Sequence, residues 1–269
     1  ALLTDAESLI EGPLTPTVDG VLAVAESRGA SQVFRVTGAG AELLLDSDAG
    51  VLIFGCGTVG ARPAADSPIM LTYRTGVGMD EVGLLEAGTV RPLTDFSAAL
   101  RAAARVREPQ ELTAAAPDGH PVHGWVVSPD GEGPHPALLL IHGGPFAQYT
   151  SAFFDEAQVY AEAGYAVVLC NPRGSAGYGR DHGRAIRTNF GNLDSADVLA
   201  FLDHAIATVP GLDGARVGIM GGSYGGYLTA WIIAHEHRFA GAIVERGYLD
   251  PASFVGASDI GWFFPAQYN

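Results

Sequence analysis

The sequence predicts two parts in series: an all-β part, then an α/β part with a doubly wound, mostly parallel sheet. Up to about residue 95, short apolar or alternating segments recur at roughly ten-residue spacing between glycine-containing turns. From about residue 108, continuous apolar runs alternate with helical patterns, the order that builds a parallel sheet with right-handed crossovers. One such run leads into a glycine-flanked serine within Gly221 to Gly226.

The first part is predicted to consist of strands. Turn signals such as Asp48-Ala49-Gly50 and Glu86-Ala87-Gly88 separate the apolar segments, and no helical pattern interrupts them. Short strands at this spacing are typical of a sandwich, a barrel or a propeller. The expected strands are 20–26, 32–37, 42–46, 51–55, 69–75, 82–86 and 89–93.

One motif in this part resembles a nucleotide-binding fingerprint. Residues 55–60 read Gly-Cys-Gly-Thr-Val-Gly after a strand, and Asp80 follows at the expected interval. A dinucleotide site needs a helix directly after the glycines, and Pro63 and Pro68 prevent one. We therefore predict a β-turn here and no nucleotide site.

The second part follows a short helix. Thr94 or Asp95 could cap a helix through Leu100, and Glu108-Pro109 follows its end, so we place the domain boundary near residue 107. Residues 137–141 are all apolar, as expected of a strand buried on both faces. The expected strands are 111–116, 122–128, 137–141, 165–170, 216–220 and 240–244, and the expected helices are 153–163, 194–208 and 227–234.

Ser223 is the predicted nucleophile. Strand, glycine-flanked serine and helix form the context of the nucleophile elbow found in α/β-hydrolases. The chain must reverse sharply at this serine, and a side chain at Gly221 or Gly225 would collide with the neighbouring strand or helix. The turn also brings the Tyr224 N–H to a helix N-terminus, where it favours negative charge. The alternative is a glycine-rich loop that carries a serine by chance.

His142-Gly143-Gly144-Pro145 follows the apolar strand at 137–141. Acyl transfer needs two N–H donors where the tetrahedral oxyanion forms. We predict that the N–H groups of Gly144 and Tyr224 are these donors. A plain turn after a strand is the alternative. His142 lies in the oxyanion loop itself, so we expect a structural hydrogen bond from it rather than general-base catalysis.

Asn171-Pro172-Arg173-Gly174-Ser175 begins another glycine-rich loop at the end of a strand. The carboxyl ends of the strands are where sites of α/β proteins are built. Arg173 is expected to brace this loop through a carboxylate. Tyr178 either directs its hydroxyl at the site or packs against the protein.

The His-Gly-Gly-Pro loop, the Asn-Pro-Arg-Gly-Ser loop and the Gly-Gly-Ser-Tyr-Gly-Gly elbow resemble those of the prolyl oligopeptidase family of serine peptidases. The His-Gly-Gly-Pro form and the segment 258–264 look more like its acylaminoacyl-peptidase branch. The resemblance covers residues 95–269 well. It implies a preceding β-propeller, a Ser223 nucleophile, oxyanion donors at Tyr224 and Gly144, no cofactor and no metal, and short peptide substrates. An esterase on the same fold and a non-catalytic, propeller-bearing binding protein are the rival interpretations.

The triad of this fold runs Ser, Asp, His along the chain, and no suitable histidine follows Ser223. His235 and His237 fall on the elbow helix, where twelve residues place His235 about 18 Å from Ser223. Asp250 and Asp259 come earlier than the family pattern implies. We therefore expect a fragment: residues 1–107 as C-terminal propeller blades with a linker helix, and 108–269 as the N-terminal part of an α/β-hydrolase domain that is inactive alone.

Composition narrows the expected partners. The net charge is −15 and every basic residue is Arg, without clusters that would favour nucleic acid or anionic membranes. Cys56 and Cys170 lie in apolar runs, which predicts reduced, buried thiols and a cytoplasmic protein. The expected partners are short peptides, a second copy of the chain and the remaining segments of the same protein. Aromatic residues at 146 and 262–264 either line a specificity pocket or serve as core or oligomer contacts.

Overall fold

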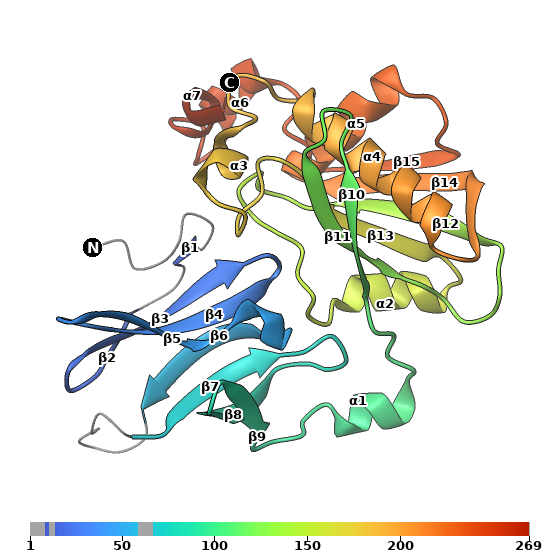
Figure 1. The fold of residues 1–269 in the computed structure, drawn as a ribbon. Helices are drawn as coiled ribbons and strands as arrows, with labels where there is room; N and C mark the ends of the chain where they lie inside the picture. The colour runs from blue at the N-terminus through green and yellow to red at the C-terminus, as the bar shows by residue number, and fades with distance from the viewer. Residues whose placement is uncertain (1–8, 11–13, 59–66, 269) are drawn as a thin grey trace. The chain divides into compact units, whose positions relative to one another are not determined.

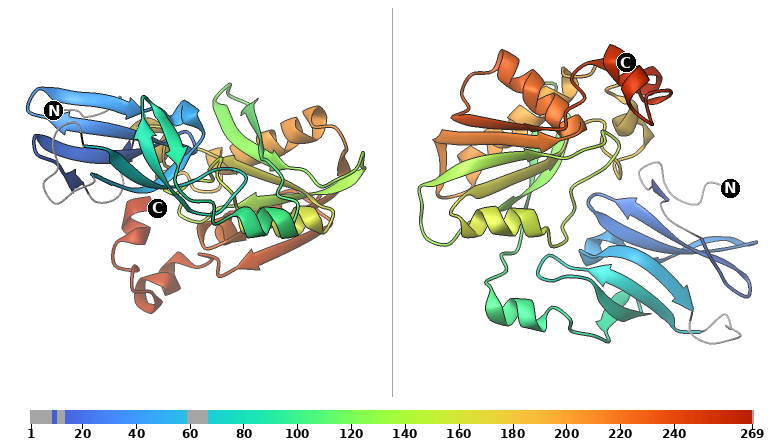
Figure 2. Two further views of the ribbon diagram at one scale, coloured as in Figure 1. Left: turned by 90° about the horizontal axis from the view of Figure 1, so that it is seen from below. Right: turned by 180° about the vertical axis from the view of Figure 1, so that it is seen from behind.

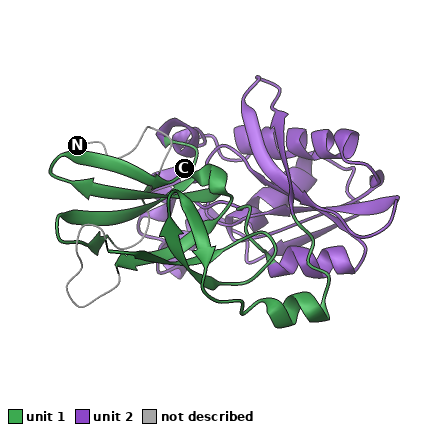
Figure 3. Cartoon of the chain, turned by 60° about the horizontal axis from the view of Figure 1, so that its bottom comes forward, with its two compact units in different colours: residues 1–108, 150–154, 177–179 green, residues 109–149, 155–176, 180–269 purple. Residues whose placement is uncertain are grey.

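The computed structural model describes residues 9–10, 14–58 and 67–268. Contacts divide the chain into two units (Figure 3). Unit 1 comprises residues 1–108, 150–154 and 177–179, and unit 2 comprises 109–149, 155–176 and 180–269. Among the described residues, no helix combines the length and apolar character needed to cross a membrane.

Unit 1 is built from two antiparallel sheets (Figure 1). The strands are β1 (Leu9–Ile10), β2 (Thr15–Pro16), β3 (Gly20–Ser27), β4 (Ala30–Thr37), β5 (Gly40–Leu45), β6 (Leu52–Thr58), β7 (Ile69–Arg74), β8 (Glu81–Glu86) and β9 (Thr89–Pro92). The first sheet has the order β1-β3-β4-β5 with β2 also on β3, and the second has the order β6-β7-β8-β9. A 3-10 turn at Ser47–Ala49 joins them.

One apolar core joins the two sheets of unit 1. Leu22, Val33 and Leu45 from the first sheet cluster with Ile53 and Leu71 from the second. The predicted strands are confirmed. They form because apolar side chains at alternating positions bury one face of each sheet. The turn predicted at the glycine motif is wrong for residues 55–58, which belong to β6 and pair with β7. The last two residues of the motif, 59 and 60, and the following Pro63 lie outside the described residues.

Helix α1 (Ala98–Ala103) begins later than its predicted caps. Its N-cap position is Ser97, without a side-chain capping bond. Thr94 is not the cap because its hydroxyl donates to Glu81 at 2.6 Å, and Asp95 instead pairs with Arg101. Glu81 also accepts hydrogen bonds from the Ser97 N–H and hydroxyl, so this one carboxylate fixes the start of the helix.

Unit 2 contains a mixed six-stranded sheet with the order β10-β11-β13-β12-β14-β15. Its strands are β10 (Gln110–Ala115), β11 (Pro121–Val127), β12 (His135–Ile141), β13 (Ala166–Asn171), β14 (Leu212–Gly222) and β15 (Gly241–Glu245). β11 pairs antiparallel with both neighbours, whereas β13, β12, β14 and β15 are parallel. The carboxyl ends of these four strands therefore meet at one edge of the sheet.

Helices cover both faces of this sheet (Figures 1 and 2). The helices of unit 2 are α2 (Asp155–Glu162), α3 (Arg180–Arg184), α4 (Leu193–Thr208), α5 (Tyr224–His235), α6 (Pro251–Ala257) and α7 (Phe264–Tyr268), of which α2, α4 and α5 cover the sheet. On one face, Phe201 of α4 and Leu228 of α5 share a core with Val217 and Ile219 of β14. Helix α2 lies on the opposite face. The alternating strand–helix order predicted from the sequence is confirmed.

Candidate active site

Ser223 occupies a strained turn between β14 and α5. Its backbone has φ 59° and ψ −119°, in the left-handed half of the map that a non-glycine residue adopts rarely and at a cost. The Ser223 N–H donates to the Glu245 carbonyl at 3.0 Å, which joins the ends of β14 and β15. The residue is exposed, so the sharp turn presents the hydroxyl to solvent as the elbow pattern predicts.

The glycines around Ser223 permit close backbone packing. A Cβ at Gly225 would lie 2.1 Å from the Ile141 carbonyl oxygen at the end of β12. A Cβ at Gly221 would lie 2.5 Å from the Gly225 oxygen. These contacts confirm the predicted collisions and show that the start of α5 rests directly on the end of β12.

Tyr224, the first residue of α5, is anchored by a buried carboxylate. Its hydroxyl donates to Asp194 Oδ2 at 2.7 Å, and both side chains are almost completely buried. Burial and the negative charge of Asp194 raise the pKa of Tyr224 well above its ordinary value, so the phenol remains a donor. The N–H of Tyr224 belongs to the first turn of the helix, where amides lack partners within the helix. The predicted oxyanion donor therefore sits on a fixed residue.

Replacing Tyr224 with Phe should destabilise the protein by about 1–3 kcal/mol, because the buried Asp194 carboxylate loses its phenol donor. Urea denaturation of the purified variant measures this loss. Tyr165→Phe is the matched control, since Tyr165 is 41% exposed, and should change stability by less than about 0.5 kcal/mol. Equal stability of the two variants would contradict the anchoring role of the pair.

The loop after β12 lies beside Ser223. A Cβ at Gly143 would be 3.7 Å from Ser223 Cβ and 3.5 Å from the Gly222 oxygen. Gly144 has φ +128°, a conformation that favours glycine. The structure thus places Ser223 next to Gly143, which directly precedes the predicted donor Gly144, at the carboxyl edge of the sheet.

His142 is buried and hydrogen-bonded within its own loop. Its Nδ1 lies 2.7 Å from the Gly143 oxygen, and its Nε2 lies 3.0 Å from Ser175 Oγ. Burial lowers the pKa of His142 to about 4, so the ring is neutral near pH 7. These contacts confirm the predicted structural hydrogen-bonding role.

Arg173 braces the loop after β13, as predicted. Its guanidinium and its backbone N–H both bond to the completely buried Asp197 of α4, with contacts of 2.6–2.9 Å. The same guanidinium pairs with Asp118 in the turn between β10 and β11. The hydrogen bonds that Arg173 donates to Asp197 and Asp118 raise its pKa, and its charge is held permanently in the loop.

The later histidines and carboxylates have other roles. The ring of His235 packs on Trp231 and its Nδ1 lies 2.7 Å from the Trp231 oxygen, far along α5 from Ser223. Asp250 is the N-cap of α6, accepting from the Ala252 N–H and the Ser253 hydroxyl. Asp259 is exposed and accepts from Ser258. No cluster of three or more potential metal ligands occurs among the described residues.

The predicted aromatic residues do not form one group. Phe264 is buried and packs with Tyr248 and Tyr268, so the core interpretation holds for it. Trp262 is 80% exposed and Phe146 is 42% exposed. A Cβ at Gly183 would lie 2.6 Å from the Phe146 ring, which places this ring against α3.

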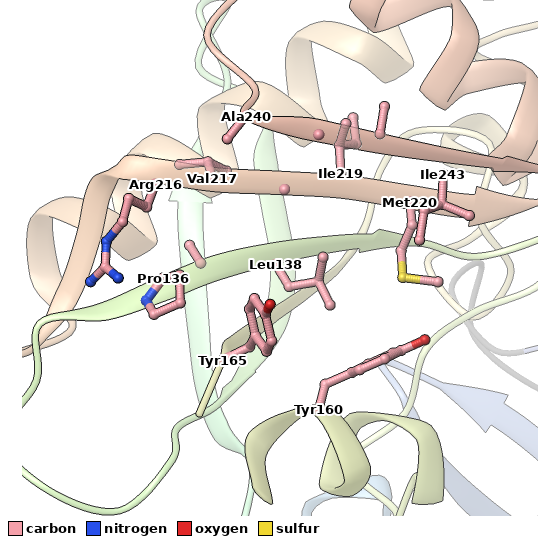
Figure 4. Close-up of a pocket in the computed structure, with 14 residues that line it drawn as sticks. Pro136, Leu138, Tyr160, Tyr165, Arg216, Val217, Ile219, Met220, Ala240 and Ile243 are labelled. Atoms are coloured by element: carbon pink, nitrogen blue, oxygen red, sulfur yellow. The ribbon is translucent and has the colours of Figure 1, made fainter. Parts of the chain in front are cut away.

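An apolar groove of about 630 Å³ opens on the sheet face next to α2 (Figure 4). Leu138, Met220 and Ile243 line its sheet side, and Tyr160 and Tyr165 lie opposite them. Neither Ser223 nor Gly144 lines it. The groove is therefore separate from the predicted catalytic residues.

Two pairs of site residues were missed by the sequence analysis. Asp194 and Asp197 lie three positions apart in α4 and are completely buried, facing Tyr224 and Arg173 respectively. Ser175 and His182 support the loops after β12 and β13: Ser175 contacts His142, and His182 contacts the Pro172 oxygen. The sequence signal for the first pair was the presence of two acidic residues on one face of a long predicted helix, near its start.

The stability of the fold should fall as the pH drops from about 6.5 to about 4. Burial lowers the pKa of both His142 and His182 to about 4, whereas the ordinary value is about 6.5. In this window the unfolded chain binds protons that the folded chain excludes, so each histidine removes up to about 1.4 kcal/mol per pH unit. Urea denaturation at pH 6.5, 5.5 and 4.5 measures the slope, and His182→Phe should flatten it. A stability that is constant over this window would contradict the neutral, buried state of both rings.

The chain is similar to known peptidases. Residues 151–269 match the family model described as prolyl oligopeptidase family. The chain is 45% identical over 159 residues to "Uncharacterized peptidase YuxL" of Bacillus subtilis, covering 58% of this chain and 24% of that protein. It is 34% identical over 137 residues to an acylamino-acid-releasing enzyme of Arabidopsis thaliana, covering 50% of this chain and 18% of that protein.

A solved structure matches nearly the whole chain. The acylaminoacyl peptidase of Pyrococcus horikoshii superposes with a TM-score of 0.88 and 26% identity, covering 99% of this chain and 42% of that one. The chain spans about a quarter or less of the curated relatives named above. The resemblance predicted from the loops and the elbow is confirmed: residues 151–269 match the prolyl oligopeptidase family model, and the chain resembles peptidases of this family.

Proposed function

We propose that this chain carries the nucleophile and the oxyanion hole of a serine peptidase that hydrolyses short peptides, of the acylaminoacyl- or oligopeptidase type. The observation that carries the proposal is the strained, exposed Ser223 beside Gly143, at the edge where the parallel strands end. The relatives named as acylamino-acid-releasing enzymes support the reaction class.

In the proposed reaction, Ser223 Oγ attacks the scissile carbonyl carbon and its proton passes to a histidine base. The N–H groups of Gly144 and Tyr224 stabilise the resulting oxyanion. The histidine then protonates the leaving amine, and an acyl-enzyme ester forms on Ser223. Water, activated by the same histidine, releases the acyl product and restores the serine, while an aspartate orients the histidine throughout.

We propose that neither the base nor its aspartate is among these 269 residues. The chain has eight histidines. Two of them contact the loops around Ser223, and both have other hydrogen-bond partners. His142 contacts Gly143 and Ser175, and His182 contacts Pro172 and His120. The 269 residues alone should therefore show only the residual ~10³–10⁴-fold acceleration over water that an oxyanion hole and binding provide. An efficient enzyme made from these residues alone would overturn this.

We propose that the two parts are the last blades of a β-propeller and the first part of an α/β-hydrolase domain. The two consecutive antiparallel sheets of unit 1 and the sheet order of unit 2 support this. The extended likeness to the Pyrococcus horikoshii acylaminoacyl peptidase supports it too.

A substrate panel tests the proposed function in the natural protein. An N-acylated short peptide, the same peptide with a free N-terminus and a simple aryl ester would be compared, with Ser223→Ala as the control. The proposal expects peptide cleavage that Ser223→Ala abolishes. Cleavage of the ester alone would establish an esterase on the same fold instead, and no hydrolysis of any substrate would favour a binding protein.

A further inference from the structure

A chain of buried and partly buried polar contacts leads from the turn between β10 and β11 to the oxyanion loop. His120 Nε2 lies 3.1 Å from His182 Nδ1, and His182 Nε2 lies 2.9 Å from the Pro172 oxygen. Ser175 Oγ lies 2.7 Å from that oxygen and 3.0 Å from His142 Nε2. His142 Nδ1 then lies 2.7 Å from the Gly143 oxygen. The proposed mechanism uses none of these side chains directly.

The protons in this chain can be assigned at His142. A carbonyl oxygen only accepts, so Nδ1 must carry the proton that bonds to Gly143 at 2.7 Å. The neutral ring has a single proton, so Nε2 accepts, and the hydroxyl of Ser175 must be its donor. The opposite assignment would direct the Nδ1 lone pair at the Gly143 oxygen.

This assignment requires another donor for the Pro172 oxygen. Ser175 has one hydroxyl proton, which cannot serve both His142 and Pro172. The Pro172 oxygen instead accepts from the Ser175 N–H at 3.0 Å and from His182 Nε2. His182 Nδ1 then accepts from His120 Nε2. Every other close contact in the chain then has one donor and one acceptor, and the 2.7 Å contact between Ser175 Oγ and the Pro172 oxygen is the one that has no proton between its atoms.

We propose that His182 is a positioning residue that fixes the tautomer of His142 through Ser175. Without the His182 donor, the Ser175 hydroxyl turns to the Pro172 oxygen, and His142 moves its proton to Nε2 to meet Ser175. The bond from Nδ1 to the Gly143 oxygen is then lost.

The consequence for catalysis rests on the proposed role of the Gly144 N–H. The carbonyl of Gly143 and the N–H of Gly144 belong to one trans peptide unit and point in opposite directions. Holding the Gly143 oxygen on His142 therefore turns the Gly144 N–H away from that ring. His182 thus acts on an oxyanion donor that it does not touch.

Nuclear magnetic resonance of ¹⁵N-histidine-labelled protein tests the tautomer directly, with the His142 signals assigned by a His142→Gln variant. The unaltered chain should carry its His142 proton on Nδ1, and His182→Phe should move it to Nε2. His182→Gln, which keeps a donor, should resemble the unaltered chain. In the double variant Ser175→Ala/His182→Phe the proton should return to Nδ1, because no hydroxyl competes. A proton on Nε2 in the unaltered chain would overturn the proposal even if every variant misfolded.

Kinetics of the natural protein separate this inference from the proposed function. His182→Phe should lower kcat about tenfold with little change in KM, a smaller loss than the ~10²–10³-fold loss on removing an oxyanion donor. His182→Gln should retain kcat. A switched tautomer with unchanged kcat would overturn the link to catalysis alone. Full activity in Ser223→Ala would instead overturn the proposed function and leave the tautomer assignment intact.

Discussion

Replacing Ser223 with Ala is expected to lower kcat of the natural protein by about 10⁶-fold, the size of loss seen when a triad serine is removed. The change deletes the atom that forms the acyl-enzyme and leaves the oxyanion donors in place. Ser223 is exposed and its side chain makes no capping bond to α5, so the variant should fold as stably as the parent. Steady-state kinetics on the best peptide substrate and urea denaturation measure the two effects.

Ser253→Ala is the matched control for that variant. Ser253 is also an exposed serine near a helix start, where its hydroxyl bonds to Asp250 rather than facing the elbow. It should retain nearly full kcat. If Ser223→Ala kept more than about one hundredth of the parent activity, Ser223 would not be the nucleophile.

Gly225→Ala should prevent stable folding of unit 2. The added methyl carbon would lie 2.1 Å from the Ile141 oxygen and 2.8 Å from the His142 oxygen, both backbone atoms of β12 and its following loop. No flexible side chain can move aside, so α5 must shift from the sheet or the strand must bend. We expect a loss of about 4 kcal/mol or more, the range that marks severe core disruption. Soluble yield and urea denaturation measure it.

Gly241→Ala provides the comparison within the same sheet. Gly241 is the first residue of β15, and a Cβ added there meets nothing within 4 Å. This variant should change stability by no more than about 0.5 kcal/mol. A Gly225→Ala protein as stable as Gly241→Ala would show that the elbow does not rest on β12 as described.

The predictable part of the structure lies in local patterns. Continuous apolar runs at residues 137–141 and 165–170 indicated strands buried on both faces, and they correspond to β12 and β13. The glycines around Ser223 and in the loop after β12 indicated a crowded, sharply turned backbone. Such signals are readable because sterics act on neighbouring residues. The sharp turn at Ser223 and the loop beside it were therefore predictable from the sequence.

The supporting residues were not predictable because their partners are distant in sequence. Asp194 and Asp197 resemble solvent-facing acids of an amphipathic helix, yet both are completely buried. Tyr224 follows Asp194 by 30 positions, and Arg173 precedes Asp197 by 24. Burial of a carboxylate is favourable only when such partners converge, which the fold decides and a sequence window does not show.

Short helices were missed for a different reason. α3 has five residues and includes Gly183, so neither length nor propensity distinguishes it from a loop. α6 carried a readable signal, because Asp250 caps it and Pro251 is its first residue. The start of α1 was predicted at Thr94 or Asp95, but Glu81 in a neighbouring strand sets it at Ser97.

The most direct test of the account is covalent labelling of the natural protein with a fluorophosphonate, followed by mass spectrometry of its peptides. The central claim is that Ser223 is an activated nucleophile facing an oxyanion hole. The account predicts one phosphonyl adduct on the peptide containing Ser223, and no labelling of Ser223→Ala. Failure of the natural protein to label, or an adduct that persists in Ser223→Ala, would contradict it.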